Sequence, residues 1–112
     1  MTEGIRTVIY PVRDLGAAKA VFGALLGTEP VMDEPYYVGY ATGNQHIGLD
    51  PSGHSQGMTG PVCYWQVSDI NAELQRLLGA GASEQNPVKD VGGGKLIATV
   101  TDPDGNVIGL MQ

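Results

Sequence analysis

Apolar and polar positions follow two different periods along this chain, and the change from one to the other happens twice. Residues 5–12 and 62–67 are rich in β-branched and aromatic side chains, which is typical of strands. Residues 14–27 and 69–79 follow them with apolar side chains at helical spacing, and each segment begins with an aspartate suited to cap a helix and ends at a glycine. The sequence therefore predicts a strand followed by a helix in two equivalent copies, 55 residues apart.

Three further strands are expected after each helix. The two closing segments resemble each other most, because in both a Gly-Asn turn leads into a strand that contains Ile-Gly-Leu. The turn before the last strand, Thr101-Asp-Pro-Asp-Gly-Asn106, has proline, aspartate and glycine in the order that a type I turn prefers. The expected strands are 29–32, 36–42 and 43–49 in the first half and 83–91, 95–101 and 105–110 in the second.

The order of strand, helix and three strands, present twice, predicts an α+β fold built from two βαβββ modules with mixed sheets. Residues 51–60 are rich in glycine and serine, which is typical of a linker. We therefore expect a single domain over residues 1–112, with module 1 at 1–50 and module 2 at 61–112.

Composition and charge narrow the possible partners. With 112 residues, 42% of them hydrophobic, the chain has the size of one ordinary domain of about 100–150 residues. Six Lys and Arg against twelve Asp and Glu give a net charge of −6, and the basic residues are scattered. This balance argues against nucleic acid as a partner and tolerates a cationic small molecule. The single cysteine, Cys63, has no partner for an intrachain disulfide, which fits a reducing compartment.

The apolar stretches indicate where the protein is found. None approaches the roughly 18 residues of a membrane span, and residues 1–4 do not begin like a signal peptide. We therefore expect a soluble, cytoplasmic protein without a membrane partner.

The repeated motifs resemble those of a known superfamily. They are the Val-x-Asp helix starts at 12–14 and 67–69, Phe22 followed by Leu25-Leu-Gly27, and above all Asp102-Pro-Asp-Gly-Asn-x-Ile-Gly-Leu110. Together they resemble the vicinal oxygen chelate superfamily, which includes glyoxalase I, extradiol dioxygenases, fosfomycin-resistance enzymes and bleomycin-binding proteins. The resemblance implies that the two βαβββ modules form curled mixed sheets around a cleft, with one face of each sheet on its helix.

Strand alternation then assigns residues to the two faces of each sheet. Larger apolar residues such as Tyr10, Leu49 and Trp65 should meet the helices, and their neighbours should line the cleft. An apolar wall with a few polar groups is typical of a small-molecule site. There Tyr64 could stack on a ligand and donate a hydrogen bond, and Asp50 could pair with a cation. The predicted ligand-binding residues are Thr7, His46, Asp50, Tyr64, Gln66 and Met111.

The metal-dependent members of the superfamily carry His, Glu or Gln ligands at four equivalent strand positions. The resemblance puts those positions at Thr7, Gly48, Val62 and Gly109. Two glycines and a valine have no side-chain donor, so we expect neither a metal nor another cofactor. The same glycines should leave room and widen the cleft.

His46 is the one titratable base expected to face the cleft, and it is the candidate catalytic residue. It could act as a general base with Asp50, although the two lie too far apart along the strand for a direct bond. A lone histidine on a strand is more often structural, and no Ser or Cys nucleophile accompanies it. His54 lies in the linker and is expected to be exposed to solvent. Three tyrosines whose facing the sequence leaves open add aromatic surface: Tyr36, Tyr37 and Tyr40.

These features favour a metal-independent, homodimeric small-molecule binding protein that sequesters an aromatic or cationic compound. The homodimer is expected because a short chain with an open sheet edge tends to pair with a second copy. The alternative is a glyoxalase-like lyase or isomerase, or a dioxygenase. It would use a displaced metal site near His46, Asp50 and His54, or metal-free acid/base chemistry through His46. A third possibility is a subunit that only dimerises or regulates a neighbour.

Overall fold

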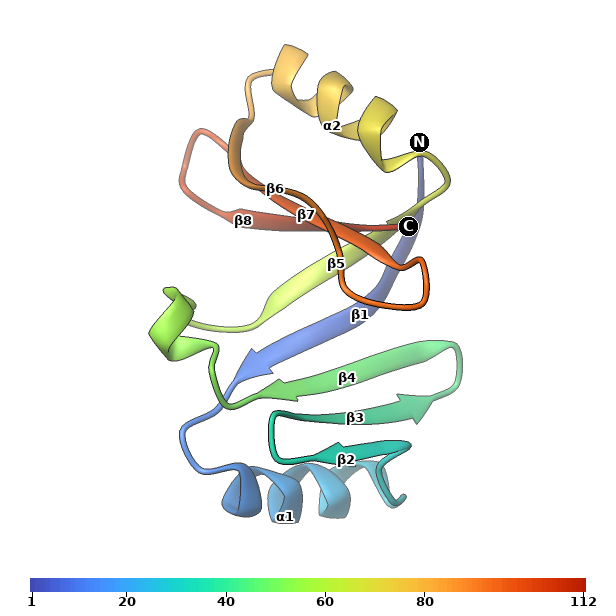
Figure 1. The fold of residues 1–112 in the computed structure, drawn as a ribbon, viewed down its shortest axis with the longest axis vertical. Coiled ribbons are helices and arrows are strands. Elements are labelled where there is room, and N and C mark those ends of the chain that lie inside the picture. Colours follow the sequence, from blue (N-terminus) through green and yellow to red (C-terminus); the bar gives the residue numbers. More distant parts are fainter. The chain divides into compact units, whose positions relative to one another are not determined.

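The computed structural model describes all 112 residues and contains two α-helices, one short 3₁₀ helix and eight strands (Figure 1). The expected α+β order of strand, helix and three strands is present twice and is confirmed. No helix is long and apolar enough to cross a membrane. The elements are, in chain order, β1 (Thr2–Pro11), α1 (Leu15–Leu26), β2 (Met32–Glu34), β3 (Tyr37–Thr42), β4 (Gln45–Asp50), η1 (His54–Gln56), β5 (Val62–Val67), α2 (Ile70–Gly79), β6 (Ser83–Asp90), β7 (Leu96–Thr101) and β8 (Val107–Met111).

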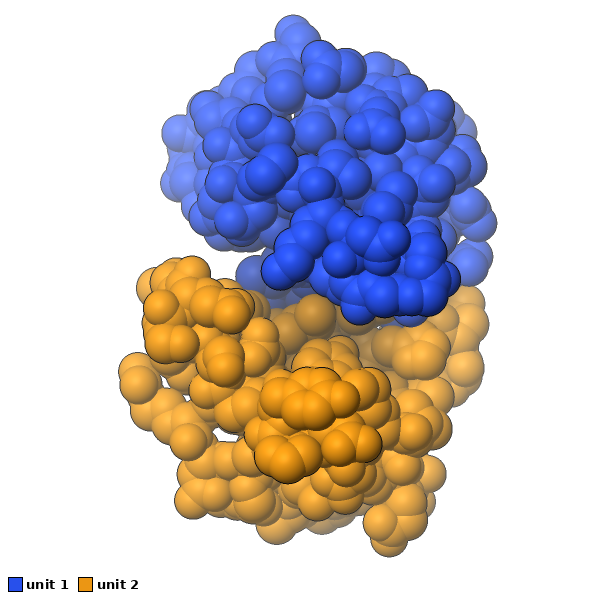
Figure 2. All heavy atoms as spheres, in the orientation of Figure 1, with its two compact units in different colours: residues 1–6, 62–112 blue, residues 7–61 orange.

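The strands form a mixed sheet, and the chain divides into two compact units (Figure 2). Unit 1 comprises Met1–Arg6 and Val62–Gln112, and its strand order is β5-β8-β7-β6, with β5 parallel to β8. Unit 2 comprises Thr7–Pro61, and its order is β2-β3-β4-β1, with β1 parallel to β4. All other strand pairs within the units are antiparallel.

In unit 2, α1 covers one face of the strands. Val38, Tyr40 and Leu49 are at most 1% exposed and form the centre of the core, against which Tyr10 packs. The rings of Tyr10 and Phe22 lie 4.9 Å apart, centroid to centroid, which joins β1 to α1. These contacts confirm that Tyr10 and Leu49 point toward the helix.

In unit 1, α2 covers the corresponding face. Trp65 packs against a core of six buried side chains, as the alternation along β5 predicts. The amide of Ile70 donates to Gln112 Oε1 at 2.8 Å, and that of Ala72 donates to Asp69 Oδ1 at 3.1 Å. Two of the free N–H groups at the start of α2 are therefore satisfied. The six buried residues are Val67, Ile70, Leu74, Ala98, Val100 and Leu110.

The two helices end differently. α1 ends as expected at Gly27, which has a φ of 65° and donates its N–H to Gly23 O. α2 also ends at the expected residue, Gly79, but this glycine is the last helical residue, and the left-handed conformation comes at Gly81 with a φ of 113°. Between them, Ala80 donates to the last carbonyl groups, so a tightened turn ends the helix.

β2 also differs from expectation. The strand predicted at 29–32 lies at Met32–Glu34, where residues 32 and 34 pair with Gly39 and Tyr37 of β3. This pairing leaves residues 35 and 36 as a two-residue turn. Pro30 has no N–H group to donate to a strand ladder, which explains why the strand begins after it.

The turn before β8 forms around one carboxylate and gives a pH prediction. Asp102 accepts hydrogen bonds from Asn106 Nδ2 at 2.8 Å, Asn106 N at 2.8 Å and Asp104 N at 3.0 Å. These bonds, led by those of Asn106, hold the pKa of Asp102 below its ordinary value of 3.8. A carboxylate with a lowered folded-state pKa stabilises the protein above its unfolded-state pKa, and this stability is lost as pH falls through the folded value.

We therefore expect Asp102→Asn to lower the melting temperature at about pH 7. The difference in melting temperature between this variant and the parent protein should become smaller as the solution is acidified below about pH 4. Thermal unfolding followed by circular dichroism across this range measures the difference. Asp104→Asn is the matched control, since Asp104 takes part in the turn through its backbone N–H group, while the accepting carboxylate is that of Asp102. A difference in melting temperature between the parent protein and Asp102→Asn that stays constant with pH would contradict the prediction.

Candidate small-molecule site

In unit 2, the strand register brings three predicted binding residues to one face. Thr7 on β1 lies directly opposite His46 on β4, and Pro11 lies opposite Asp50. Directly opposed residues point to the same side of a sheet, so Thr7, His46 and Asp50 share a face. That face is opposite to the one on which Leu49 meets α1.

The three side chains have different surroundings. Thr7 is 6% exposed, whereas His46 is exposed near the start of β4. Asp50 Oδ1 accepts a hydrogen bond from Ser52 N at 2.8 Å, so this carboxylate holds the turn after β4 and does not orient the His46 ring. The expectation that Asp50 and His46 are not directly bonded agrees with this geometry.

In unit 1, the register does the same for the other three predicted residues. Gln66 on β5 lies opposite Met111 on β8, and Tyr64 precedes Gln66 by two residues. The three therefore share the face opposite to Val67 and Leu110, which meet α2. Tyr64 and Met111 are 9% and 7% exposed. The face agrees with expectation, while ligand binding by these residues stays a prediction.

A tyrosine ring fills the space next to Gly48. A Cβ atom at residue 48 would lie 2.0 Å from Tyr37 Oη and 2.7 Å from Tyr37 Cζ, far inside contact distance. The same ring passes over Gly39, where an added Cβ would lie 3.2 Å from Tyr37 Cε2. The expectation that Gly48 leaves open room is therefore wrong, because the missing Cβ is what allows the ring to lie there.

Unit 1 repeats this arrangement at Gly109. A Cβ atom at residue 109 would lie 2.6 Å from Tyr64 Cδ1, 2.8 Å from Tyr64 Cγ and 2.9 Å from Cys63 O. Tyr64 is the residue directly opposite Gly109 on the neighbouring strand. Both glycines at the expected ligand positions are thus covered by tyrosine rings, and neither widens a cleft.

The other two tyrosines near β3 have separate roles. Tyr40 is 1% exposed in the core of unit 2, and its hydroxyl donates to Lys19 O at 3.3 Å. Tyr36 lies in the turn before β3 and is 64% exposed. The sequence leaves open which face of the sheet each of these tyrosines covers. In the structure, Tyr37 alone of the three covers the face that contains Gly48.

Neither the four strand positions nor the alternative cluster fits a metal ion. The four positions supply one hydroxyl group and no imidazole or carboxylate. In addition, no group of three or more His, Cys, Asp or Glu side chains lies close enough together to hold an ion. His46, Asp50 and His54 therefore do not come together as a displaced metal site.

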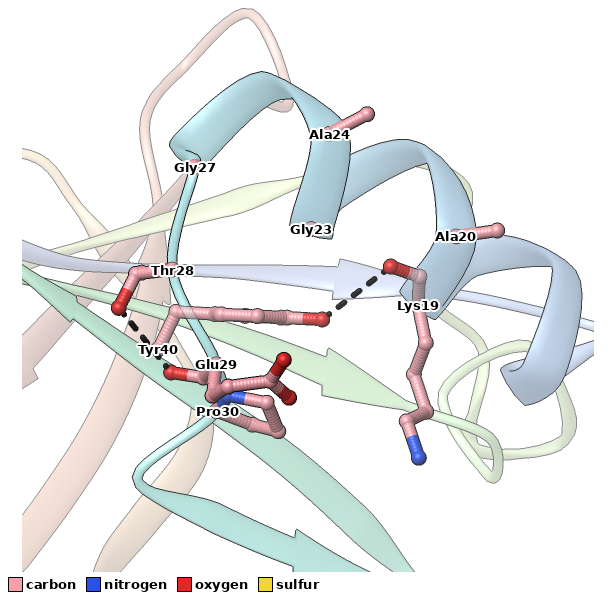
Figure 3. A pocket seen from close by; sticks show the side chains of 9 residues that line it. All are labelled: Lys19, Ala20, Gly23, Ala24, Gly27, Thr28, Glu29, Pro30 and Tyr40. Carbon is pink, nitrogen blue, oxygen red and sulfur yellow. Dashed lines mark hydrogen bonds between the residues drawn. The ribbon is translucent and has the colours of Figure 1, made fainter.

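Two surface hollows occur in unit 2, and neither is lined by the predicted binding residues. One, of about 450 Å³, lies beside α1, with Lys19 and Tyr40 in its wall (Figure 3). The other, of about 570 Å³, is next to η1 and includes His54. The expectation that His54 is exposed is wrong, since its side chain is half-buried and Nδ1 is enclosed without a hydrogen-bond partner.

Sequence reasoning missed a hydrogen-bonded trio in unit 1. Thr99 on β7 is 5% exposed, and its Oγ1 donates to Gln85 Oε1 at 2.9 Å and accepts from Asn86 Nδ2 at 2.8 Å. Thr99 lies opposite Gly109, so it shares the face covered by Tyr64. The sequence gives only a weak indication of this trio, because the side chains of two adjacent residues in a strand, here Gln85 and Asn86, normally point to opposite faces.

Comparison with known proteins identifies the family. The profile of the Glyoxalase/Bleomycin resistance protein/Dioxygenase superfamily matches residues 4–110. The chain belongs to this superfamily, which confirms the resemblance in its repeated motifs. A search of curated protein sequences finds no match.

Solved structures share the fold at low sequence identity. A glyoxalase/bleomycin resistance protein/dioxygenase superfamily member from Vibrio splendidus 12B01 aligns with a TM-score of 0.72 and 19% identity over 95% of each chain. Methylmalonyl-CoA epimerase from Mycobacterium tuberculosis aligns with a TM-score of 0.73 and 20% identity over 98% of this chain and 87% of the epimerase. Hypothetical protein BH1468 from Bacillus halodurans C-125 gives 0.75 and 13%, over 96% of this chain and 91% of the other. These similarities establish the fold.

Proposed function

We propose that this chain is a metal-independent small-molecule binding protein of the glyoxalase and bleomycin-resistance type, which sequesters an aromatic or cationic compound in the cytoplasm. The observation that carries the proposal is the ring over each closing-strand glycine, Tyr37 over Gly48 and Tyr64 over Gly109. Where metal-dependent members of the superfamily carry ligands on the closing strands, this chain has the aromatic surface of tyrosine rings and no imidazole or carboxylate. Such a surface binds by stacking and hydrogen bonding.

The predicted binding residues supply the polar part of this chemistry. Gln66 can both donate and accept beside the Tyr64 ring. Asp50 uses one carboxylate oxygen for Ser52 N and offers the other to a cationic group. The faces of tyrosine rings attract cations, and the net charge of −6 favours a cation over an anion. In this proposal the two modules act as a single domain over residues 1–112.

Metal content of protein purified without a chelator or an affinity tag tests the metal-independent part of the proposal. We expect zinc, nickel, iron, manganese and cobalt, measured by mass spectrometry, to be present at far less than one ion per chain. One tightly held divalent ion per chain would overturn the proposal and favour an enzyme of the family.

Thermal shift with benzyltrimethylammonium, an aromatic cation, tests the binding part. A ligand that prefers the folded state raises the melting temperature, and we expect a saturable rise. Tyr37→Leu should reduce the rise, whereas Tyr36→Leu, its neighbour in the exposed turn, should keep it. No rise with this cation or with neutral benzamide would contradict the proposed ligand class. Chemical conversion of a bound probe that is lost in His46→Ala would favour the alternative, metal-free acid/base catalysis.

We also propose that the protein is a homodimer that pairs through α1. None of the residues of α1 is buried, and Val21 and Leu25 are 66% and 74% exposed. The one charged side chain of the helix, Lys19, is bonded to Asp33 at 2.8 Å. Because α1 itself carries no carboxylate and that of Asp33 beside it is paired with Lys19, two copies that each carry a charge of −6 can approach along this helix.

Light scattering coupled to size-exclusion chromatography tests the dimer. We expect twice the chain mass of 11.7 kDa for the parent protein and a mass near that of one chain for Leu25→Glu. Val91→Glu places the same charge at an apolar position that is 48% exposed in unit 1, and it should leave the dimer intact. A parent protein that elutes as a monomer at every concentration would contradict this proposal.

A further inference from the structure

The trio of Thr99, Gln85 and Asn86 depends on a β-bulge in the edge strand β6. Glu84 pairs with Val100 and Asn86 pairs with Thr99, so β6 advances by two residues where β7 advances by one. Gln85 is the extra residue, and such a bulge re-aims a side chain that regular alternation would send to the other face. Both amides thereby reach the same hydroxyl group, at 2.9 Å and 2.8 Å.

The hydroxyl group of Thr99 bonds to the oxygen of one amide and to the nitrogen of the other. It has one proton to donate, and it gives that proton to Gln85 Oε1 while it accepts from Asn86 Nδ2. Consequently the NH₂ group of Gln85 and the carbonyl oxygen of Asn86 are left for other partners. The side chains of Gln85 and Asn86 are exposed, whereas Thr99, to which both are bonded, is 5% exposed. The two amides are therefore accessible to a ligand while a buried residue holds them in position.

The pair lies in line with the aromatic part of the proposed site. The register runs from Tyr64 through Gly109 and Thr99 to Asn86 across four neighbouring strands. The base of the Tyr64 ring lies beside Gly109, and Thr99 is one strand spacing of about 5 Å further on, on the same face. A flat ligand that lies over these strands can therefore contact the exposed amide pair together with the accessible part of the Tyr64 ring, which is 9% exposed.

From this geometry we propose that Gln85 and Asn86 recognise a neutral carboxamide or cyclic amide on the ligand. The carbonyl oxygen of such a group accepts from Gln85 Nε2, and its N–H donates to Asn86 Oδ1. A carboxylate has two acceptors and an amidinium has only donors, so each can satisfy just one member of the pair. This inference rests on the proposed small-molecule binding function and specifies the polar group that the bound compound carries.

Titration of the ¹⁵N-labelled full-length protein with benzamide, benzoate and benzamidine tests the inference, since the three share one ring and differ in the donors, acceptors and charge of its substituent. The charges of benzoate and benzamidine are opposite, so weaker binding of both cannot be an effect of charge alone. Side-chain NH₂ signals of Gln85 and Asn86 in two-dimensional NMR spectra report the contact. We expect saturable shifts with benzamide and about tenfold weaker binding of the other two, the effect of one unmatched hydrogen bond.

Gln85→Glu removes the donor but keeps an oxygen that Thr99 can reach, and it should weaken benzamide binding about tenfold. Gln75→Glu makes the same change on the exposed surface of α2 and should leave benzamide binding unchanged. Equal binding of benzoate or benzamidine, equal binding by Gln85→Glu, or no saturable benzamide shift would overturn the amide assignment. The proposed function fails separately, through a stoichiometric metal ion or through the absence of any aromatic ligand.

Discussion

Gly109→Ala is expected to destabilise the folded protein by about 3 kcal/mol or more, the upper end for overpacking a core. The new Cβ atom would lie 2.6 Å and 2.8 Å from Cδ1 and Cγ of Tyr64 and 2.9 Å from Cys63 O. Cγ is close to the backbone of β5, and the carbonyl oxygen is part of it, so neither can move without shifting the strand. Urea denaturation followed by circular dichroism measures the loss.

The pseudo-equivalent Gly48→Ala should cost less, about 1–3 kcal/mol. Here the new atom would meet Oη and Cζ of Tyr37, the far end of a side chain that can rotate away. Replacing Tyr37 by leucine should therefore recover most of the loss at residue 48, and the two substitutions should couple in a double-mutant cycle. Tyr64→Leu should recover less at residue 109, because Cys63 O remains in the way.

Gly60→Ala is the matched control for both substitutions, because no atom lies within 4 Å of its added Cβ. It should change the free energy of unfolding by no more than about 0.5 kcal/mol. If Gly48→Ala and Gly109→Ala behaved like this control, the tyrosine rings would not occupy the space beside the glycines. The observation that carries the proposed function would then be lost.

Much of the fold could be predicted from the sequence because the two modules repeat the same signals. Each strand shows its core face by alternation, and Tyr10, Trp65 and Leu49 lie on the expected side for that reason. Helix starts were equally clear, since each aspartate has an N–H group three residues later to accept from. The ends of the helices at Gly27 and Gly79 were also predicted, although the left-handed glycine after α2 is Gly81.

The site was less predictable because its contacts depend on partner strands. Alternation indicates that Gly48 faces away from α1, but only the pairing of β3 with β4 shows that the Tyr37 ring covers it. The bulge that brings Gln85 to Thr99 is likewise a mismatch between two strands, and neither strand signals it alone. Helical spacing in α1 resembles that in α2, yet only α2 has buried residues.

Leu49→Ala is the second substitution with a large expected effect, a loss of about 2–5 kcal/mol in the free energy of unfolding. Leu49 is fully buried in unit 2, between Val38 on β3 and Tyr10 on β1, which are its direct partners in the sheet. Both neighbours are held by strand pairing, so they cannot close the cavity that the shorter side chain leaves. The total stability of a small protein is about 5–15 kcal/mol, and this single change therefore removes a large share of it.

Leu25→Ala makes the same change on α1, where the side chain is 74% exposed, and in dilute solution it should cost no more than about 0.5 kcal/mol. Urea denaturation of the two variants at several protein concentrations separates the core from the dimer surface. A loss at Leu49 should not depend on concentration, whereas a loss at Leu25 that grows with concentration indicates a dimer contact, since association stabilises the folded state by mass action. Equal, concentration-independent losses at the two positions would contradict both the burial of Leu49 and the exposure of α1, because identical substitutions can differ in cost only through their surroundings.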